Sequence, residues 1–212
     1  MSSSSAKTNI LNKIRQALEN PTPLPFPKAE GLENFIQPLQ QDLVVEFAEQ
    51  FTKLQGKFIF CANRSELHEQ FDKLRFQNQW TKLYCVEDEW RSELQQPQWH
   101  DDIASSEIAI TGCEALVART GSIVLSSSAN RRVPSVYAPI HICIAYASQL
   151  IYDIKEALEF IRNKYQNQLP SLISFATGPS RTADIEKTLV VGVHGPKEVY
   201  CFLVDDLANS GE

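Results

Sequence analysis

The chain has 212 residues, a formal net charge of −6, 43% hydrophobic residues and 22% charged residues, which is ordinary for a soluble globular protein. The acidic balance and the scattered Lys and Arg residues argue against non-specific nucleic-acid binding. The first residues show neither the apolar core of a signal peptide nor the run of about 20 apolar residues that a membrane helix needs. We therefore expect a cytoplasmic protein without membrane insertion.

An N-terminal extension is expected over residues 1–38. Apolar residues at helical spacing predict a short amphipathic helix over residues 8–19, which Asn20-Pro21 ends. These apolar residues are Ile10, Leu11, Ile14 and Leu18. Prolines at positions 21, 23, 25 and 27 then favour an extended segment that wraps or tethers a surface, because proline fixes φ and lacks a backbone donor. The folded domain is expected over residues 39–212, beginning with a helix that ends at Gly56.

Strand and helix patterns alternate after Gly56. Residues 57–62 and 82–87 are predicted strands around a helix opened by Ser65, which together make a βαβ unit. A hairpin or two adjacent strands are expected around Thr120-Gly121, and a crossover helix over residues 153–165. The other predicted strands cover residues 106–112, 140–147, 172–178, 188–193 and 199–204. The predicted fold class is α/β, with a mixed, mainly parallel sheet flanked by helices.

The cysteines are expected to be core residues. They number five, show no Cys-x-x-Cys spacing, and four of them lie in apolar, strand-like runs. Neither the cysteines nor the four histidines cluster in the sequence, although folding could assemble distant ligands. No GxGxxG or GxxxxGK[ST] motif supports a nucleotide site. We therefore expect no metal and no cofactor bound by this chain alone.

The segment of residues 177–196, TGPSRTADIEKTLVVGVHGP, concentrates polar and flexible residues and is the predicted binding loop. Its amides could form a concave anion-binding surface, and Arg181 offers a planar fork to a carboxylate or phosphate. In the alternative reading, the hydroxyls and Asp184 cap turns and Arg181 pairs with Asp184 or Glu186. The predicted ligand-binding residues are Thr120, Gly121, Gly178, Ser180, Arg181, Thr182, Gly192 and Gly195.

His194 and Asp184 are the candidates for proton transfer. Gly192 and Gly195 flank His194 and could present its ring to a ligand. The alternative is a histidine at a strand end that makes one backbone hydrogen bond and has no chemical role. His141 is expected to be a buried core residue whose hydrogen bonds are satisfied.

A second loop places Arg131 and Arg132 after a run of small residues, SSSAN, that follows a predicted strand. These arginines could close over an anion or meet an acidic partner. Equally, the segment could be a solvated connection with ordinary surface charge.

Three segments carry a resemblance to a known family: AITGCEALVARTGSIVLSS, APIHICIAYASQLI and FATGPSRTADIEKTLVVGVHGP. They resemble the lactate-utilisation protein C family, whose members consist of a LUD domain, over roughly residues 104–205. The resemblance implies a fold similar to the ribose-phosphate isomerase, glucosamine-phosphate deaminase and CoA-transferase group. It also implies involvement in oxidising L-lactate to pyruvate alongside iron–sulfur partner proteins.

One position departs from this resemblance. Several relatives carry an acidic residue directly before the hydroxyl-glycine pair, whereas this chain has Arg119 before Thr120-Gly121. A catalytic base at that position is therefore lost, and Arg119 could instead fix an anion or pair with an acidic neighbour.

Two function classes follow. In the first, the chain is a non-redox subunit that docks with iron–sulfur lactate-utilisation proteins and helps to bind or channel a small carboxylate. In the second, it is a stand-alone enzyme that holds an anionic substrate with Arg181 and transfers protons with His194 or Asp184. Homo-oligomer formation stays open in both classes.

Overall fold

The computed structural model describes residues 3–19, 39, 41–96, 98–128, 131–166, 168–182 and 190–207. The chain divides into two units, residues 1–38 and residues 39–212. In the first unit, helix α1 (Ser3–Glu19) begins earlier than the sequence predicts and ends where predicted. Its apolar residues Ile10, Leu11 and Ile14 are exposed. The predicted proline-rich segment lies outside the described residues.

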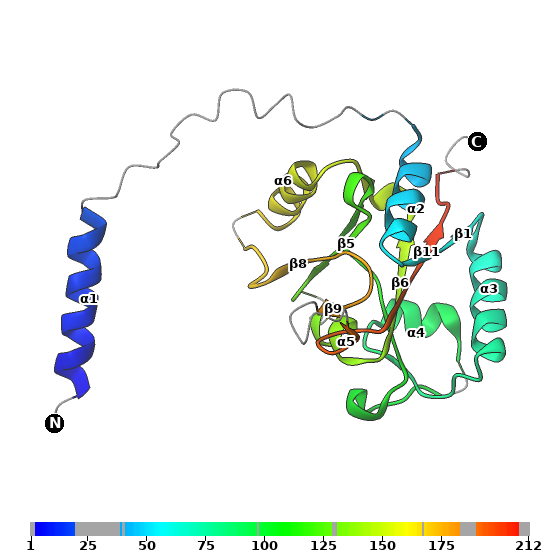
Figure 1. Ribbon diagram of the computed structural model, residues 1–212, viewed down its shortest axis with the longest axis horizontal. Helices are drawn as coiled ribbons and strands as arrows, with labels where there is room; N and C mark the ends of the chain where they lie inside the picture. The colour runs from blue at the N-terminus through cyan, green and yellow to red at the C-terminus, as the bar shows by residue number, and fades with distance from the viewer. Residues whose placement is uncertain are drawn as a thin grey trace. The chain divides into compact units, whose positions relative to one another are not determined.

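The central sheet of the second unit contains five parallel strands in the order β1-β11-β6-β3-β2 (Figure 1). Their bounds are β1 (Lys57–Cys61), β2 (Leu83–Cys85), β3 (Ile108–Thr111), β6 (Ile140–Tyr146) and β11 (Glu198–Val204). Cys201 of β11 lies between Phe58 of β1 and Cys143 of β6. β1 and β2 follow each other in the chain but lie at opposite edges of this sheet. The predicted strand–helix–strand order is therefore present, without pairing between its two strands.

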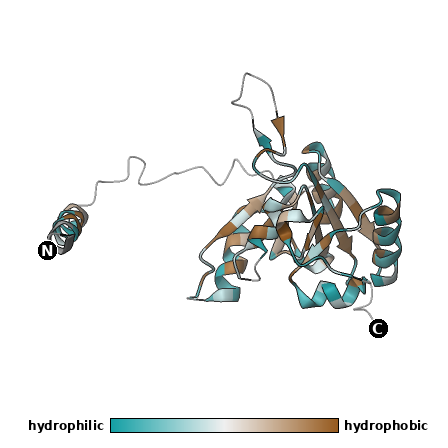
Figure 2. Cartoon of the chain, turned by 90° about the horizontal axis from the view of Figure 1, so that it is seen from below, coloured by the Kyte–Doolittle hydropathy of each residue, from teal (hydrophilic) through white to brown (hydrophobic). Residues whose placement is uncertain are grey.

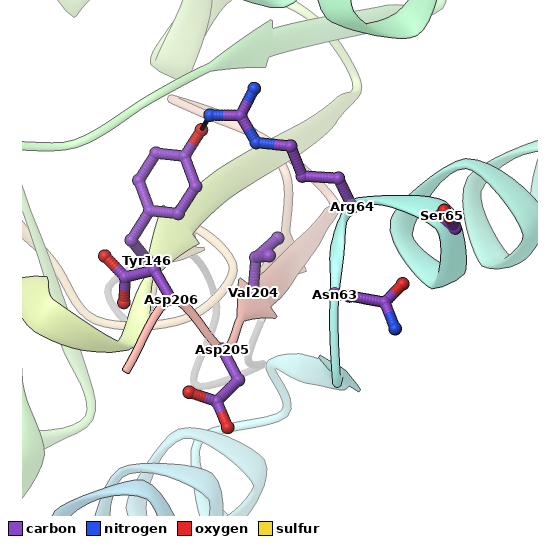
Figure 3. A pocket seen from close by; sticks show the side chains of 7 residues that line it. All are labelled: Asn63, Arg64, Ser65, Tyr146, Val204, Asp205 and Asp206. Carbon is purple, nitrogen blue, oxygen red and sulfur yellow. Dashed lines mark hydrogen bonds between the residues drawn. The ribbon is translucent and has the colours of Figure 1, made fainter. Parts of the chain in front are cut away.

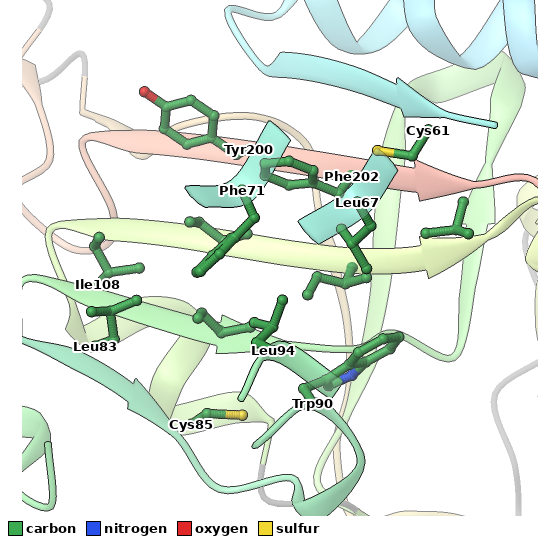
Figure 4. Packing of buried hydrophobic residues seen from close by; sticks show 14 of the residues in the cluster. Cys61, Leu67, Phe71, Leu83, Cys85, Trp90, Leu94, Ile108, Tyr200 and Phe202 are labelled. Carbon is green, nitrogen blue, oxygen red and sulfur yellow. The ribbon is translucent and has the colours of Figure 1, made fainter. Parts of the chain in front are cut away.

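Helices α3 (Arg64–Gln77) and α4 (Asp88–Leu94) pack on one face of the central sheet. Leu67 and Phe71 lie one turn apart on α3, so both side chains reach the sheet and pack near Phe202 (Figure 4). The N-cap of α3 is Asn63, whose side chain accepts a hydrogen bond from the Glu66 amide, 3.0 Å away. The prediction of Ser65 as the opening residue was therefore wrong, because Asn63 satisfies the first-turn amide and Ser65 lies inside the first turn.

The other face of the central sheet packs against helix α2 and a second sheet, which share one apolar cluster with it. α2 (Leu43–Lys53) is capped by Asp42 and buries Phe47 and Phe51. The second sheet has four strands in the order β7-β4-β5-β8, and α6 (Ile154–Tyr165) packs Ala157 and Ile161 against it. The strands are β4 (Ala115–Val117), β5 (Ser122–Ser126), β7 (Leu150–Ile151) and β8 (Ile173–Ala176).

The remaining elements are short. A two-stranded antiparallel ladder joins β9 (Arg181–Thr182) to β10 (Val190–Val191), and α5 (Arg132–Tyr137) follows the loop after β5. The 3-10 turns are η2 (Ile103–Ser105), η3 (Ala118–Thr120) and η4 (Ala147–Gln149). β4 and β5 form an antiparallel pair around η3, which confirms the predicted hairpin at Thr120-Gly121.

The predicted α/β class, with a mainly parallel central sheet flanked by helices, is confirmed. Figure 2 shows hydrophobic residues along the strands of the domain and hydrophilic residues over much of its helices. None of the helices described here has the length and the apolar character that crossing a membrane requires.

All five cysteines are free, and all are buried, as the sequence predicts. Burial raises the pKa of the Cys61 and Cys85 thiols to about 12. Both thiols are therefore protonated near neutral pH.

His141 on β6 is a buried core histidine, as predicted, but only half of its hydrogen-bonding capacity is used. Its Nε2 lies 2.8 Å from Thr111 Oγ1, whereas Nδ1 has no partner among the described residues. Burial lowers the pKa of His141 from 6.5 to about 4, because the interior disfavours the imidazolium.

The free energy of unfolding is expected to fall as the pH is lowered from about 6.5 to about 4. In this window the unfolded chain binds a proton on His141 that the folded chain does not, which adds a slope of up to about 1.4 kcal/mol per pH unit. Urea unfolding across this range should show a shallower slope for His141→Phe. The exposed His194→Phe variant is the control, and a slope unchanged in His141→Phe would contradict this expectation.

Candidate functional site

The two ends of the predicted binding loop meet at the base of the β9–β10 hairpin. The Ser180 amide donates to the Pro196 carbonyl, and the Gly192 amide donates to the Ser180 carbonyl, both at 2.9 Å. Gly195 lies against Ser180, where an added Cβ would come 3.0 Å from the Ser180 Cβ. These contacts join the two halves of the predicted loop, and each engages Ser180.

The two predicted glycine turns meet at the C-terminal end of α2. Gly121 has φ +58°, and a Cβ there would lie 2.5 Å from the Phe51 backbone nitrogen. Gly178 has φ +78°, and a Cβ there would clash with the Leu54 carbonyl oxygen. Close backbone packing and left-handed backbone therefore account for both glycines. A ligand-binding role for them stays a prediction.

Hydroxyl groups connect these turns. Thr120 Oγ1 lies 2.8 Å from Ser122 Oγ, which lies 2.8 Å from Thr177 Oγ1. Arg181 is exposed, and its Nη2 donates to the Leu54 carbonyl oxygen at 3.4 Å. A cation at this place complements the partial negative charge of the α2 C-terminus. The structure thus brings Thr120, Gly121, Gly178 and Arg181 to the same helix end.

The two candidates for proton transfer are His194 and Asp184. His194 is exposed and lies in the turn between β10 and β11. Asp184 and Glu186 lie outside the described residues, so the pairing of Arg181 with either of them stays a prediction. Thr182 belongs to β9 and is partly buried. Four surface pockets formed by described residues are lined by neither Arg181 nor His194.

Arg119 pairs with an acidic neighbour, which is one of the two alternatives that the sequence leaves open. Its Nε lies 2.5 Å from Asp153 Oδ2, and its amide donates to the Tyr152 carbonyl at 3.0 Å. Burial opposes the ionisation of Asp153, but hydrogen bonds from Lys155 and Arg119 outweigh it and lower the pKa of that carboxyl.

Arg131 is the centre of an ion-pair cluster around the buried Glu114, which neither interpretation of its loop in the sequence predicts. Its guanidinium binds the Glu87 carboxylate at 2.8 Å and the Glu114 carboxylate at 3.1 Å. Lys164 Nζ lies 2.7 Å from the other Glu114 oxygen. The neighbouring Arg132 is exposed, so it alone fits the predicted surface charge.

Glu114 is ionised although its side chain is fully buried. Burial raises its pKa, but hydrogen bonds from Lys164 and Ser126, with the positive charges of Lys164 and Arg131, overcome this and lower the pKa overall. Tyr165 donates a further hydrogen bond at 3.0 Å. The cluster joins the loop after β2, the start of β4, the loop before α5, and α6. It therefore fixes the two sheets and α6 to one another at this end of the domain.

A pocket lies at the carboxyl ends of β1, β11 and β6, the edge at which open α/β sheets usually bind ligands. It encloses about 520 Å³. Figure 3 shows its lining, which combines one guanidinium, one phenol, two carboxylates, one amide, one hydroxyl and an aliphatic side chain. The lining residues are Asn63, Arg64, Ser65, Tyr146, Val204, Asp205 and Asp206. We call it the carboxyl-edge pocket.

Arg64 and Tyr146 close one side of the carboxyl-edge pocket. Arg64 Nη2 donates to the Tyr146 hydroxyl at 3.1 Å (Figure 3). Arg64 Nη1 lies 2.9 Å from the Glu93 carboxylate. The second Glu93 oxygen lies 2.9 Å from His68 Nε2. Burial raises the pKa of Tyr146, so its hydroxyl stays protonated. Sequence reasoning missed this pocket, because its residues come from three distant segments without a shared motif.

No group of three or more His, Cys, Asp or Glu side chains in the described part of the chain is arranged to hold a metal ion.

Comparison with known proteins places the chain in a family. The family profile described as "LUD domain" matches residues 72–204. A lactate utilization protein C of Bacillus subtilis is 35% identical over 145 residues, which cover 62% of this chain and 60% of that protein. The corresponding protein of Deinococcus radiodurans is 30% identical over 110 residues, covering 51% of each chain. That of Shouchella clausii is 38% identical over 103 residues, covering 48% of this chain and 45% of that protein.

These alignments span about half the length of the curated relatives, and up to 60% of one. A solved structure supports the fold. The crystal structure of a DUF162 family protein from Deinococcus radiodurans superposes with a TM-score of 0.58 at 18% identity, covering 79% of this chain and 99% of that one. The predicted family is confirmed, and the chain belongs to the LUD domain family.

Proposed function

We propose that this chain acts in the cytoplasm in the use of L-lactate, as a non-redox subunit of a system that oxidises L-lactate to pyruvate. The observation that carries this proposal is the LUD domain match over residues 72–204. It is supported by relatives named lactate utilization protein C, with identities of 30–38%. Each relative is matched over only part of its length, so its activity is a proposal for this chain.

The non-redox role is supported by where the thiols lie. An iron–sulfur cluster is held by several cysteine thiolates that converge on it. Cys61 and Cys85 are buried and hold their protons with pKa values of about 12, while Cys113, Cys143 and Cys201 lie together in the apolar cluster on the other face of the central sheet, where the pKa values of Cys113 and Cys143 are raised as well. In this proposal, iron–sulfur partner proteins supply the clusters and carry the electrons, and this chain docks with them.

The role is tested by deleting the gene in the source organism and growing the strain on L-lactate as the sole carbon source. Loss of growth on L-lactate, with normal growth on glucose and rescue by the full chain, is the expected result. Unimpaired growth on L-lactate in a strain without a second gene of this family would contradict the role.

A stand-alone enzyme is the second candidate, and the carboxyl-edge pocket is the observation that favours it. Such an enzyme would turn over an anionic substrate by acid/base chemistry without any partner. The purified chain incubated alone with L-lactate, pyruvate and other small carboxylates separates the two candidates. Arg181 and His194 do not line this pocket, so turnover that survives replacement of both but is lost in Arg64→Gln would move the chemistry from the predicted loop to the pocket.

A further inference from the structure

Helix α5 turns three large apolar side chains toward water. Val133, Val136 and Tyr137 are 53%, 49% and 58% exposed. Val136 and Tyr137 follow Val133 by three and four residues, so the three side chains share one side of the helix. Pro134 and Ser135 face the domain and are buried. Water does not stabilise an apolar side chain, and adjoining exposed apolar residues mark interaction sites. This stripe is therefore a candidate docking surface.

Both ends of α5 are held in place, so the stripe is formed before any partner arrives. Just before the helix, the Arg131 guanidinium is bound to the Glu87 and Glu114 carboxylates. Just after it, the Pro139 carbonyl accepts the Lys197 amide at 2.7 Å. A partner that binds here does not have to order the helix, which lowers the entropic cost of binding.

Two cations border the stripe. Arg132 is the first residue of α5, and Lys197 is joined through its amide to the segment that follows Tyr137. Both side chains are exposed, and neither forms a hydrogen bond or an ion pair with another described residue. We call Arg132, Val133, Val136, Tyr137 and Lys197 the α5 face.

Three carboxylates near the α5 face have partners of their own. Glu198 pairs with Lys57 at 2.6 Å. Glu107 accepts two backbone amides, at 2.9 and 3.0 Å. Asp102 precedes η2, which contacts α5, and accepts the Ser105 hydroxyl at 2.7 Å. Both cations of the α5 face therefore stay available to an acidic partner.

These features select among occupants of the α5 face. A protein surface with an apolar centre and carboxylates around it would cover the stripe and pair both cations. A second copy bound about a two-fold axis would instead bring the cations of both α5 faces together. An anionic membrane repels a chain of net charge −6, and attraction to two cations offsets this only in part.

We propose that the α5 face docks a different protein, through an apolar patch that is bordered by carboxylates. The identity of this protein rests on the proposed function: it is one of the iron–sulfur lactate-utilisation proteins. Tyr137 and the two valines lie against the apolar patch of the partner, and Arg132 and Lys197 pair with its carboxylates. The α5 face shares no residue with the carboxyl-edge pocket.

Biolayer interferometry of the full chain with each purified iron–sulfur lactate-utilisation protein of the source organism tests the proposal. Tyr137→Ala should weaken binding of the partner about tenfold or more, because aromatic residues carry much of the binding energy of an interface. Phe76→Ala truncates an exposed aromatic residue on α3 and is the matched control. It should bind the partner as the unaltered chain does.

Charge reversal tests the border of the α5 face. Arg132→Glu and Lys197→Glu should each weaken binding of the partner about tenfold and make it less sensitive to salt, because charges at the rim of an interface steer association. Lys73→Glu reverses an exposed cation on α3 and should leave binding unchanged. Urea unfolding of each variant shows whether the fold is retained.

Three results would overturn the docking proposal. The first is a failure of the unaltered chain to bind any of these proteins, or equal binding by all variants. The second is a dimer of the chain alone, seen by analytical ultracentrifugation, that Tyr137→Ala abolishes. The third is sedimentation of the chain with phosphatidylserine vesicles that Arg132→Glu abolishes.

The growth assay distinguishes this proposal from the proposed function. If the deletion strain fails to grow on L-lactate and the double variant Arg132→Glu, Tyr137→Ala rescues it fully, the docking proposal fails and the role in L-lactate use stands. If the deletion strain grows normally on L-lactate, the role fails, whatever the binding measurement shows.

Discussion

Replacing Arg131 with methionine is expected to lower the free energy of unfolding by about 3–5 kcal/mol, as when one partner of a buried ion pair is removed. The guanidinium binds Glu87 and Glu114, and the Glu114 side chain has no exposed surface. Without Arg131, Glu87 loses its ion-pair partner and Glu114 keeps one cation, Lys164, beside its hydrogen bonds from Ser126 and Tyr165. Urea unfolding followed by circular dichroism measures the loss.

Two further variants make this expectation specific to the cluster. The neighbouring Arg132→Met removes an exposed charge and should change the free energy of unfolding by no more than about 0.5 kcal/mol. Adding Glu87→Gln to Arg131→Met should restore part of the loss, because it removes a negative charge that has lost its cation while the side chain can still accept the Gly112 amide. Equal effects of Arg131→Met and Arg132→Met would show that the cluster does not stabilise the fold.

Replacing Phe51 with alanine is expected to cost about 3–5 kcal/mol, the usual result of truncating a buried aromatic side chain. Phe51 has no exposed surface and stacks on Phe47 with ring centroids 5.3 Å apart. Gly56 packs directly on its ring, where a Cβ would lie 2.5 Å from Phe51 Cε1. Truncation would thus open a cavity beneath the turn that leads into β1.

Phe76→Ala is the matched control for this variant. Phe76 lies on α3 with 70% of its surface exposed, so the same change removes little buried area. The change at Phe76 should stay within about 0.5 kcal/mol in the same urea titration. A comparable loss in both variants would contradict the packing described for α2.

Local patterns in the sequence predict most of the elements. The apolar alternation after Gly56 gives the α/β class, and the turn residues Thr120-Gly121 give the β4–β5 hairpin. These features depend on neighbours in the chain, so periodicity and turn chemistry reveal them. The cysteines are predicted to be buried for the same reason, because they lie in apolar runs.

Long-range features could not be predicted from the same patterns. β1 and β2 lie at opposite edges of the sheet because β11, from the end of the chain, pairs with β1. The start of α3 was misjudged because Asn63 and Ser65 are both good capping residues, and only the backbone shows which one accepts the Glu66 amide.

The candidate site was only partly predictable, for a similar reason. Arg131 looks like a surface residue in a loop of small residues, and only Glu87 and Glu114, which lie 44 and 17 residues away, reveal its burial. The carboxyl-edge pocket combines residues near positions 64, 146 and 205. Charge and spacing along the chain do not reveal which of these groups folding brings together.

The most direct test of the proposed role is reconstitution of L-lactate oxidation from purified proteins. The iron–sulfur lactate-utilisation proteins of the source organism are mixed with an electron acceptor, with and without this chain, and L-lactate-dependent reduction of the acceptor is measured. We expect oxidation when the chain and its partners are combined, and none with the chain alone. Full activity of the partners without the chain, or oxidation by the chain alone, would contradict its assignment as a non-redox subunit.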